Sequence, residues 1–343
     1  MIGAGIVGLT TAYLLAQAGR KVVVLEAQAL GGGNTGRTTA HLASALDDRY
    51  KELVRVRGRE HASTAWRAHT AAIDGIAAMV RAEQIDCEFE RVDGFLVLAP
   101  GDDPKALDEE LAACREIGFT TAERVAGTPI GGPALRFPGQ AQFHPLRYLA
   151  GLARAVIRHG GAIHPHTRAA RISGGAAPQV ETSAGAVVRA GAVVQATNVP
   201  IDGNQGVHPR QAPYMTYALA LALPAGLYPR GLLWDTLDPY HYVRTHPVAG
   251  GELLIVGGED HKAGQADDGE RRFAALERWA RERFADAGAV VHRWSGMVLE
   301  AIDGLALIGR AHGEAHVYIA TGDSGMGMTH GTIAGMLIRD LVL

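Results

Sequence analysis

Met1-Ile-Gly-Ala-Gly-Ile-Val-Gly-Leu9 opens the chain, and Val22-Val-Val-Leu-Glu26 completes the stretch that decides the fold. Gly3, Gly5 and Gly8 form a G-x-G-x-x-G turn. The glycines of such a turn allow a tight bend, close approach of the backbone to a pyrophosphate, and close packing of helix on strand. This spacing predicts a dinucleotide-binding unit at the start of the chain.

The residues after the turn agree with this prediction. The apolar pattern over 6–17 predicts a helix, and Lys21–Leu25 predicts a buried parallel strand. Ile6 and Val7, at the helix N-terminus, would offer N–H groups and a positive dipole end to phosphates. Glu26, followed by Ala27, stands where an acid accepts hydrogen bonds from an adenosine ribose hydroxyl. The expected ligand is an adenine dinucleotide.

The strand expected before Gly3 has only Met1 and Ile2, whereas a strand normally runs about 5–6 residues. Because this strand would lie at the centre of a doubly wound sheet, we expect either an internal start of the numbering or a truncated first strand.

Composition excludes several classes of protein. The chain of 343 residues has a net charge of −3 without a basic block, which argues against nucleic acid as a partner. Cys87 and Cys114 lack metal-ligand spacing, so we expect no disulfide framework, metal site or iron–sulfur cluster. The longest apolar run, Tyr214–Tyr228, is interrupted by Pro224 and is shorter than a bilayer span. We expect a soluble, cytoplasmic protein without a secretion signal.

A second strand, Gly-rich loop and helix unit lies at the far end of the chain. Val317–Thr321 predicts a buried strand, residues 322–331 a glycine-rich loop, and Thr332–Leu343 a helix. A single NAD site does not need this second unit, whereas a larger dinucleotide held at both ends of the sequence does. Between the two units, a predicted buried strand ends in Ala196-Thr-Asn198, at the edge that faces the cofactor crevice of a doubly wound sheet.

Strand-like segments in the middle of the chain predict a second sheet. They include residues 89–98, which we expect to form a hairpin, and residues 212–223, 240–245 and 252–256. The period of two places Tyr240, Tyr242 and Arg244 on one face. Two phenols and a guanidinium suit a carboxylate-bearing substrate, because arginine binds carboxylates bidentately. The alternative is a solvated outer face of an antiparallel sheet.

Taken together, these motifs resemble the D-amino-acid/glycine/sarcosine oxidase (DAO) family of FAD-dependent oxidoreductases, over nearly the whole chain. Besides the N-terminal turn, the resemblance rests on Gly36-Arg-Thr-Thr-Ala-His41, Val193-Val-Gln-Ala-Thr-Asn198, the segment from Asp303 to Gly309, and Thr321-Gly-Asp-Ser-Gly-Met-Gly-Met-Thr-His-Gly331. The sequences of these motifs are most similar to those of bacterial members whose flavin part is followed by a Rieske iron–sulfur domain. Because the chain stops at Leu343, we expect the Rieske part to be absent.

The resemblance implies FAD as the cofactor and an α/β fold. A discontinuous Rossmann-like FAD-binding domain would comprise residues 1–85, 140–205 and 295–343, and an α+β substrate domain with an antiparallel sheet would comprise 86–139 and 206–294. The residues expected to bind the cofactor are Gly3, Gly5, Ile6, Val7, Gly8, Glu26, Ala27, Gly36, Arg37, Thr38, Thr39, His41, Ala196, Thr197, Asn198, Gly309, Gly322, Gly325, Gly327, Met328, Thr329 and Gly331.

The implied reaction is oxidation of a carbon–nitrogen bond of an amino acid or amine, by hydride transfer to the flavin. Arg244, with Tyr242 and Tyr240, would contact the substrate, and His330 would lie near the flavin ring, where donors stabilise its reduced anion. His41 stands in a Thr-Thr-Ala-His sequence spaced like the segment that holds flavin covalently in some family members. The alternatives are a non-covalent histidine beside the ring or a plain loop histidine.

Two other functions compete with this interpretation. An NAD(P)-dependent dehydrogenase would not need the loop over 322–331. A truncated or non-catalytic flavin-binding fragment would need a partner iron–sulfur domain. Oxygen, a quinone and an iron–sulfur protein all stay open as electron acceptors, beside a small-molecule amine or amino-acid substrate.

Overall fold

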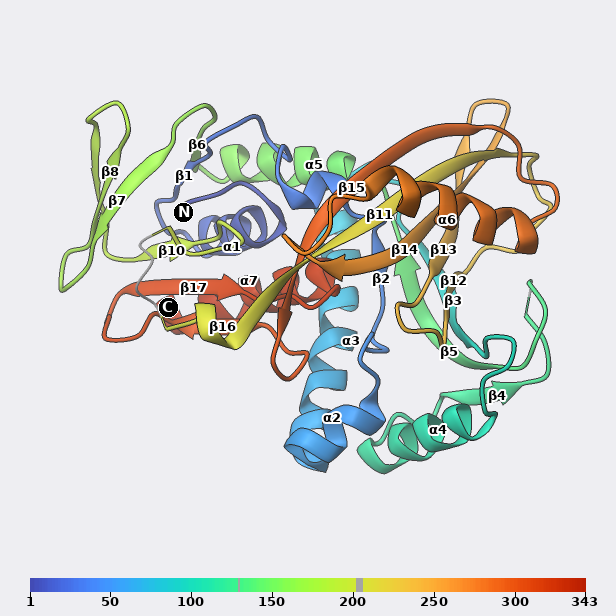
Figure 1. Cartoon of the computed structure of the whole chain (residues 1–343). Coiled ribbons are helices and arrows are strands. Elements are labelled where there is room, and N and C mark those ends of the chain that lie inside the picture. The colour runs from blue at the N-terminus through green and yellow to red at the C-terminus, as the bar shows by residue number, and fades with distance from the viewer. Residues whose placement is uncertain (129, 202–205) are drawn as a thin grey trace.

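A mostly parallel sheet, sheet A, is built around the first residues of the chain (Figure 1). Ile2 bridges Leu25 on one side and Gln195 on the other, both in parallel. In the computed structural model, which describes residues 1–128, 130–201 and 206–343, the strands follow in the order β6 (Ala162–His164), β1 (Val23–Leu25), Ile2, β10 (Val193–Gln195), β17 (Val317–Thr321) and β16 (Leu307–Arg310). Only β16 runs antiparallel to its neighbour. The predicted Rossmann-like α/β architecture is therefore confirmed.

Helix α1 (Ile6–Gln17) spans the residues that the sequence predicted. It is buried on nearly every side from Ile6 to Ala16, which fits its lack of a polar face. Gly19, at a φ of +78°, follows the helix end in the left-handed conformation that glycine adopts without steric cost. Apolar side chains of α1 share one core with α3 (Arg59–Ala82) and α5 (Pro145–Arg158), so the helix is held from several directions.

Helix α7 (Gly327–Val342) begins five residues earlier than predicted. The sequence placed Met328, Thr329 and His330 in a loop, but they form the first turn of the helix. The sequence did not reveal this helix start, because glycines usually disfavour a helix. Here Gly331 and Gly335 contact the surface of α1 instead of breaking the helix. A Cβ on Gly335 would lie 2.6 Å from Thr10 Cγ2, and one on Gly331 would lie 2.6 Å from Ile6 Cγ2.

A large mixed sheet, sheet B, faces sheet A across the molecule (Figure 1). In the described part of the chain its strands follow in the order β15 (Val290–Ala301), β11 (Gln211–Leu223), β14 (Gly251–Lys262), β13 (Tyr242–Val248), β12 (Leu232–Asp235), β3 (Glu90–Val97), β5 (Ala134–Gln142) and β2 (His41–Leu42), with β4 (Glu123–Val125) paired to β5. The hairpin expected over 89–98 is wrong. These residues form the single strand β3, because it pairs in parallel with β12 and antiparallel with the distant β5.

Helices cover sheet B, and a separate small sheet packs against sheet A. Helix α6 (Gly269–Arg283) packs Leu276 and Trp279 onto apolar residues of β11 and β14. At the other end of sheet B, α2 (Tyr50–Arg57) and α4 (Lys105–Ile117) share a core with β3 and β5. The remaining elements are the meander β7 (Ala169–Ser173), β8 (Gln179–Thr182) and β9 (Val187–Arg189), and the short helices η1 (Asn34–Arg37) and η2 (His208–Arg210).

The elements bear on the predicted domain boundaries in three places. Strand β5 crosses position 140, β15 crosses position 295, and β2 pairs with β5 although it lies within 1–85. The expected boundary after residue 205 falls beside residues 202–205, which lie outside the described residues. We therefore propose a two-domain division in which β2, β5 and β15 belong to the substrate domain. No helix in the described part of the chain combines the length and apolar character needed to cross a membrane.

The packing of α1 on α7 can be tested with two helix glycines. Gly335→Ala should lower the free energy of unfolding by about 1–3 kcal/mol, because the added methyl group overpacks the contact with Thr10. Gly75→Ala, in α3, is the matched control. A Cβ there would meet only Met336 Sδ at 3.6 Å and Thr332 Cγ2 at 3.9 Å, so the change should raise stability by about 0.5–1 kcal/mol. Urea unfolding of both variants measures the difference, and equal stabilities would contradict the close contact.

Candidate active site

A cavity of about 650 Å³ lies between the two sheets. One end is formed by the turn at Gly3 and Gly5 and by the residues that follow β1, β10 and β17. The other end reaches sheet B, where Thr216 of β11, Tyr242 of β13 and Asp260 of β14 line the wall. A single elongated space therefore joins the N-terminus of α1 to the face of the second sheet.

The sheet A end is a backbone cradle without room for side chains. Gly3 has a φ of +99°, and a Cβ on it would lie 2.3 Å from the carbonyl oxygen of Ala196. A Cβ on Gly8 would lie 1.9 Å from the carbonyl oxygen of Gly3. The N-cap residue of α1 is Gly5, which has no side chain, and Ile6 and Val7 of the first turn line the cavity. Such a helix start binds anions such as a pyrophosphate.

Glu26 lies at the end of β1 and lines the same space. Its Oε2 accepts a hydrogen bond from Ala4 N at 2.7 Å, and its Oε1 accepts one from Gln28 N at 2.8 Å. These two backbone donors fix the carboxylate beside the turn, and each oxygen keeps a further lone pair for a ribose hydroxyl. Thr35, which the sequence analysis missed, supports the helix start, because its Oγ1 accepts a hydrogen bond from Ile6 N at 3.1 Å. The residues at this end fit an adenine dinucleotide.

His41 lines the middle of the cavity with both ring nitrogens engaged. Its Nε2 lies 3.3 Å from the carbonyl oxygen of Val243, and its Nδ1 lies 3.2 Å from Thr39 Oγ1. Because a carbonyl oxygen can only accept, Nε2 carries the proton and Nδ1 accepts from the threonine hydroxyl. Burial, with the nearby charge of Arg244, lowers the pKa of His41 to about 3, so the ring is neutral.

Arg244 itself is buried and does not line the cavity. Its Nε donates to the carbonyl oxygen of Thr39, and its Nη1 is buried without a hydrogen-bond partner among the described residues. Burial lowers the pKa of Arg244 to about 10, so the guanidinium stays charged at neutral pH. The structure thus brings Tyr240 and Tyr242 into the wall of the cavity and leaves Arg244 out of it.

A second histidine closes the cavity beside the start of α7. His330 lines the wall, and its Nδ1 lies 2.9 Å from the carbonyl oxygen of Asp323. Burial lowers the pKa of His330 to about 4. Its ring lies 4.6 Å from that of His69, whose Nδ1 is 2.8 Å from Thr329 Oγ1. Thr329 therefore points toward α3 and not into the cavity.

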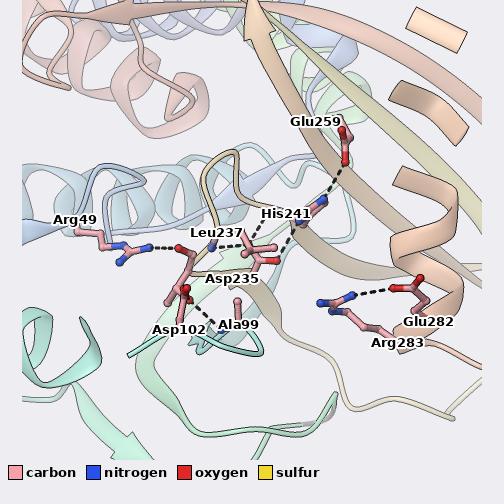
Figure 2. A network of polar contacts seen from close by, with 10 residues as sticks. Arg49, Ala99, Asp102, Asp235, Leu237, His241, Glu259, Glu282 and Arg283 are labelled. Atoms are coloured by element: carbon pink, nitrogen blue, oxygen red, sulfur yellow. Dashed lines mark hydrogen bonds and ion pairs between the residues drawn. The ribbon is translucent and has the colours of Figure 1, made fainter. Parts of the chain in front are cut away.

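The segment that carries Tyr240 is held by a buried polar network (Figure 2). Asp235 accepts a hydrogen bond from His241 N at 2.9 Å and contacts His241 Nδ1 at 3.1 Å. On the other side of the ring, His241 Nε2 lies 3.4 Å from Glu259 Oε1 (Figure 2). Trp279 stacks on the same ring at 4.3 Å between centroids. Since Glu259 precedes Asp260, this network positions cavity residues of β13 and β14 together.

Four carboxyl groups line the cavity beyond Glu26: Asp47, Asp260, Glu300 and Asp323. Burial raises all four pKa values, to about 7 for Asp47, about 6 for Asp260 and Asp323, and about 8 for Glu300. For Asp47 and Glu300, repulsion from neighbouring carboxyl groups, Asp48 among them, adds to burial. Asp47 faces Asp260 and Asp323, and Glu300 faces Asp47 and Asp323. This part of the cavity strongly favours a gain of positive charge.

Most of the sequence-predicted site residues line the cavity: Gly3, Gly5, Ile6, Val7, Glu26, Ala27, Arg37, Thr38, Thr39, His41, Ala196, Thr197, Asn198, Tyr240, Tyr242, Gly322, Gly325, Gly327, Met328, His330 and Gly331. Gly8, Gly36, Arg244, Gly309 and Thr329 do not. Gly8 and Gly36 pack against the backbone of Gly3 and Gly31 instead. The sequence analysis missed Thr35, Asp47, Thr216, Trp234, Asp260, Glu300 and Asp323. Asp323 carried a local signal, because it lies in the glycine-rich loop predicted over 322–331.

The raised pKa of Glu300 predicts how stability depends on pH. A carboxyl group whose pKa rises from its ordinary 4.5 to about 8 on folding stabilises the fold below the lower value, and this contribution is lost as pH rises toward 8. In the flavin-free protein, Glu300→Gln should therefore gain stability relative to wild type between pH 5 and pH 8.5, by about 2 kcal/mol after allowance for partial exposure. Urea unfolding at both pH values measures it, with Glu116→Gln on the exposed face of α4 as control. Equal changes in both variants would contradict the assignment.

Comparison with known proteins agrees with this geometry. The sequence profile of the family described as FAD dependent oxidoreductase (DAO) matches residues 1–341. A protein of Bacillus subtilis described as a Rieske 2Fe-2S iron-sulfur protein, YhfW, is 32% identical over 346 residues, which cover all of this chain and 68% of that protein. The gamma-glutamylputrescine oxidoreductase of Escherichia coli is 26% identical, over all of this chain and 82% of its own length.

A solved structure has the same fold. The glycine oxidase from Geobacillus kaustophilus superposes with a TM-score of 0.82 at 19% identity, covering 99% of this chain and 93% of that one. The family match excludes the alternative of an NAD(P)-dependent dehydrogenase, because the family depends on FAD. The elongated cavity, with its dinucleotide cradle at one end, and the match over nearly the whole chain lead to one conclusion. This chain belongs to the DAO family of FAD-dependent oxidoreductases.

Proposed function

We propose that this oxidoreductase oxidises the carbon–nitrogen bond of an amine or amino acid. The observation that carries the proposal is the single cavity, which extends from the dinucleotide cradle of sheet A to the aromatic and acidic wall of sheet B. FAD, when bound, supplies the acceptor for a hydride and its two electrons. The names of relatives, among them a gamma-glutamylputrescine oxidoreductase and a glycine oxidase, support a nitrogen-bearing substrate.

In this proposal, different residues at the sheet A end bind different parts of the cofactor. The first turn of α1, with Gly5, Ile6 and Val7, holds the pyrophosphate, and Glu26 holds the adenosine ribose. Thr39, His41 and the segment from Gly325 to Gly331 enclose the flavin ring. His330, neutral and bonded through Nδ1, keeps Nε2 for a contact with the cavity contents.

The substrate end of the cavity is assigned to Tyr240 and Tyr242, with their rings 5.6 Å apart. Their phenol groups are held in place, Tyr240 by a 2.7 Å hydrogen bond to Asp47 Oδ2 and Tyr242 by a 2.9 Å contact with Thr216 Oγ1. These residues orient the amine and exclude water from one face of the site. Arg244 stays behind this wall, so its role is to hold the backbone of Thr39 and to place a fixed positive charge near His41.

We expect FAD to be held without a covalent bond. Both ring nitrogens of His41 already have protein partners, and its neutral ring is fixed between Thr39 and Val243. Acid precipitation of the purified yellow protein should therefore release the flavin into the supernatant. Colour that stays with the pellet in wild type and leaves it in His41→Ala would show covalent attachment through His41. Tyr13→Phe, remote from the cavity, serves as the matched aromatic control.

The reaction can be tested directly by reduction of the flavin. Under anaerobic conditions, an amine or amino acid that is a substrate should bleach the visible flavin absorbance in a single turnover, and the product mixture should contain the corresponding carbonyl compound and ammonia or a smaller amine. Tyr242→Phe should slow this step at least threefold without changing the flavin content, because only the contact with Thr216 and the cavity is lost. A panel of primary, secondary and α-carboxylated amines that leaves the flavin oxidised would overturn the proposal.

A further inference from the structure

We propose that the substrate is an amine carrying a second cationic group, such as a linear diamine, and not an amino acid held by its carboxylate. This inference rests on the proposed function, since it specifies which amine the same cavity accepts. It also departs from the expectation that Arg244 would clamp a substrate carboxylate.

Carboxyl groups from separate parts of the chain meet where the sheet B wall of the cavity approaches the loop before α7. Asp47 follows β2, and Asp260 lies near the end of β14. Glu300 lies on β15, and Asp323 lies between β17 and α7. These elements come together only in the folded protein, where repulsion from Asp260 and Asp323 raises the pKa of Asp47, and repulsion from Asp47 and Asp323 raises that of Glu300. Mutual repulsion of this kind is relieved when a cation enters the space between the groups.

No fixed positive charge of the protein balances these carboxyl groups within the described lining of the cavity. The guanidinium groups that line it belong to Arg37 and Arg168. Arg168 follows Thr167, whose N–H bonds the carbonyl oxygen of Glu26, so it lies at the ribose end. Arg37 lies on η1, where its Nη1 is 3.5 Å from the carbonyl oxygen of Ser295. The two lining histidines, His41 and His330, are neutral, as their lowered pKa values indicate.

One further arginine lies near the acidic wall. Arg272 exerts its charge on Asp260. Its Nε, however, donates to Asp268 Oδ1 at 2.7 Å, and its Nη1 donates to the carbonyl oxygen of Glu259 at 2.9 Å. Arg272 does not line the cavity. It therefore anchors the end of β14 to α6 from outside the cavity, where its charge only partly offsets the raised pKa of Asp260.

Asp260 supplies an independent sign of a missing cationic partner. The carboxyl group interacts with the Thr216 hydroxyl, but its Oδ1 is buried and has no hydrogen-bond partner among the described residues. Tyr240, Tyr242 and Trp234 line the same end of the cavity. An alkylammonium group satisfies both features, because it donates hydrogen bonds to a carboxylate and is attracted to aromatic ring faces. A substrate carboxylate placed there would instead add to the repulsion.

The two amino groups of a diamine then have different tasks. The distal ammonium group binds Asp260 and the neighbouring carboxyl groups, while the other amine, in its neutral form, presents its C–H bond to the flavin. Hydride transfer removes two electrons and one proton from the substrate, the loss of a further proton from nitrogen leaves the neutral imine, and water converts this imine to an aldehyde and ammonia. FAD of the holoenzyme is the oxidant, so the step balances without another reagent.

The experiment compares three compounds of similar chain length on the FAD-loaded protein: diaminobutane, n-butylamine and norvaline. Anaerobic stopped-flow measurement of flavin reduction gives the rate of reduction and the apparent dissociation constant. For a compound that reduces the flavin slowly, the change in the flavin spectrum just after mixing reports binding alone. Wild type should prefer diaminobutane over both others by at least about tenfold. Asp260→Asn should weaken diaminobutane by about ten- to hundredfold and n-butylamine by less than threefold.

Asp267→Asn is the matched control, because it removes an exposed acid from the same region and should change neither compound. Asp47→Asn is the second variant, and it should also reduce the preference for diaminobutane. Folding and flavin content are checked by thermal unfolding and visible absorbance. Norvaline reacting as well as diaminobutane, or equal losses for both amines in Asp260→Asn, would overturn the inference while leaving the proposed oxidation intact. Selective binding of diaminobutane without flavin reduction would overturn the proposed oxidation and support the cationic site.

Discussion

The rest of the structure depends on the contact between the backbone of Gly3 and the backbone around Ala196. At this contact Ile2 joins two halves of sheet A, and Gly8 allows α1 to start directly against the turn. The distances leave no room for a Cβ on Gly3 or Gly8. Consequently the N-terminus of α1 lies at the edge where parallel strands end, and its first turn, with Ile6 and Val7, lines the cavity. The start of α7 is placed relative to this helix start, because α7 packs on α1 through Gly331 and Gly335.

The cavity places opposite electrostatic demands at its two ends. The sheet A end offers N–H groups and a helix dipole, which stabilise the anionic part of a dinucleotide. The sheet B end offers carboxyl groups whose ionisation costs free energy until a cation arrives, as their raised pKa values show. Between them lie two histidines kept neutral by burial. This division suits a cofactor held permanently at one end and a cationic substrate that enters and leaves at the other.

The polar network of Asp235, His241 and Glu259 explains how a wall of this kind is kept in order. Buried carboxyl groups are costly unless they are hydrogen-bonded, and here Asp235 of β12 and Glu259 of β14 both contact His241, which immediately precedes β13. The network lies behind the wall, so Tyr240, Tyr242 and Asp260 can face the cavity without bonding to one another. Oxidases of this family that are similar in fold at 19% identity need not share this wall, because fold and substrate are set by different residues.

The sequence by itself determined the first dinucleotide unit, the length of α1 and the position of Glu26, because their interactions are local and the period of burial is visible in the residues. It also carried the resemblance to the family, through motifs such as Gly36-Arg-Thr-Thr-Ala-His41, and the profile match over residues 1–341 confirms that resemblance. Only the tertiary structure decided that β3 pairs with distant strands, that α7 starts at Gly327, and that Arg244 is buried behind Thr39. The alternation of side chains along the strand placed Arg244 on one face of the sheet, but it does not predict which residues cover that face. The acidic wall was likewise hidden, because Asp47, Asp260, Glu300 and Asp323 are far apart in the chain and meet only when the two sheets pack around one cavity.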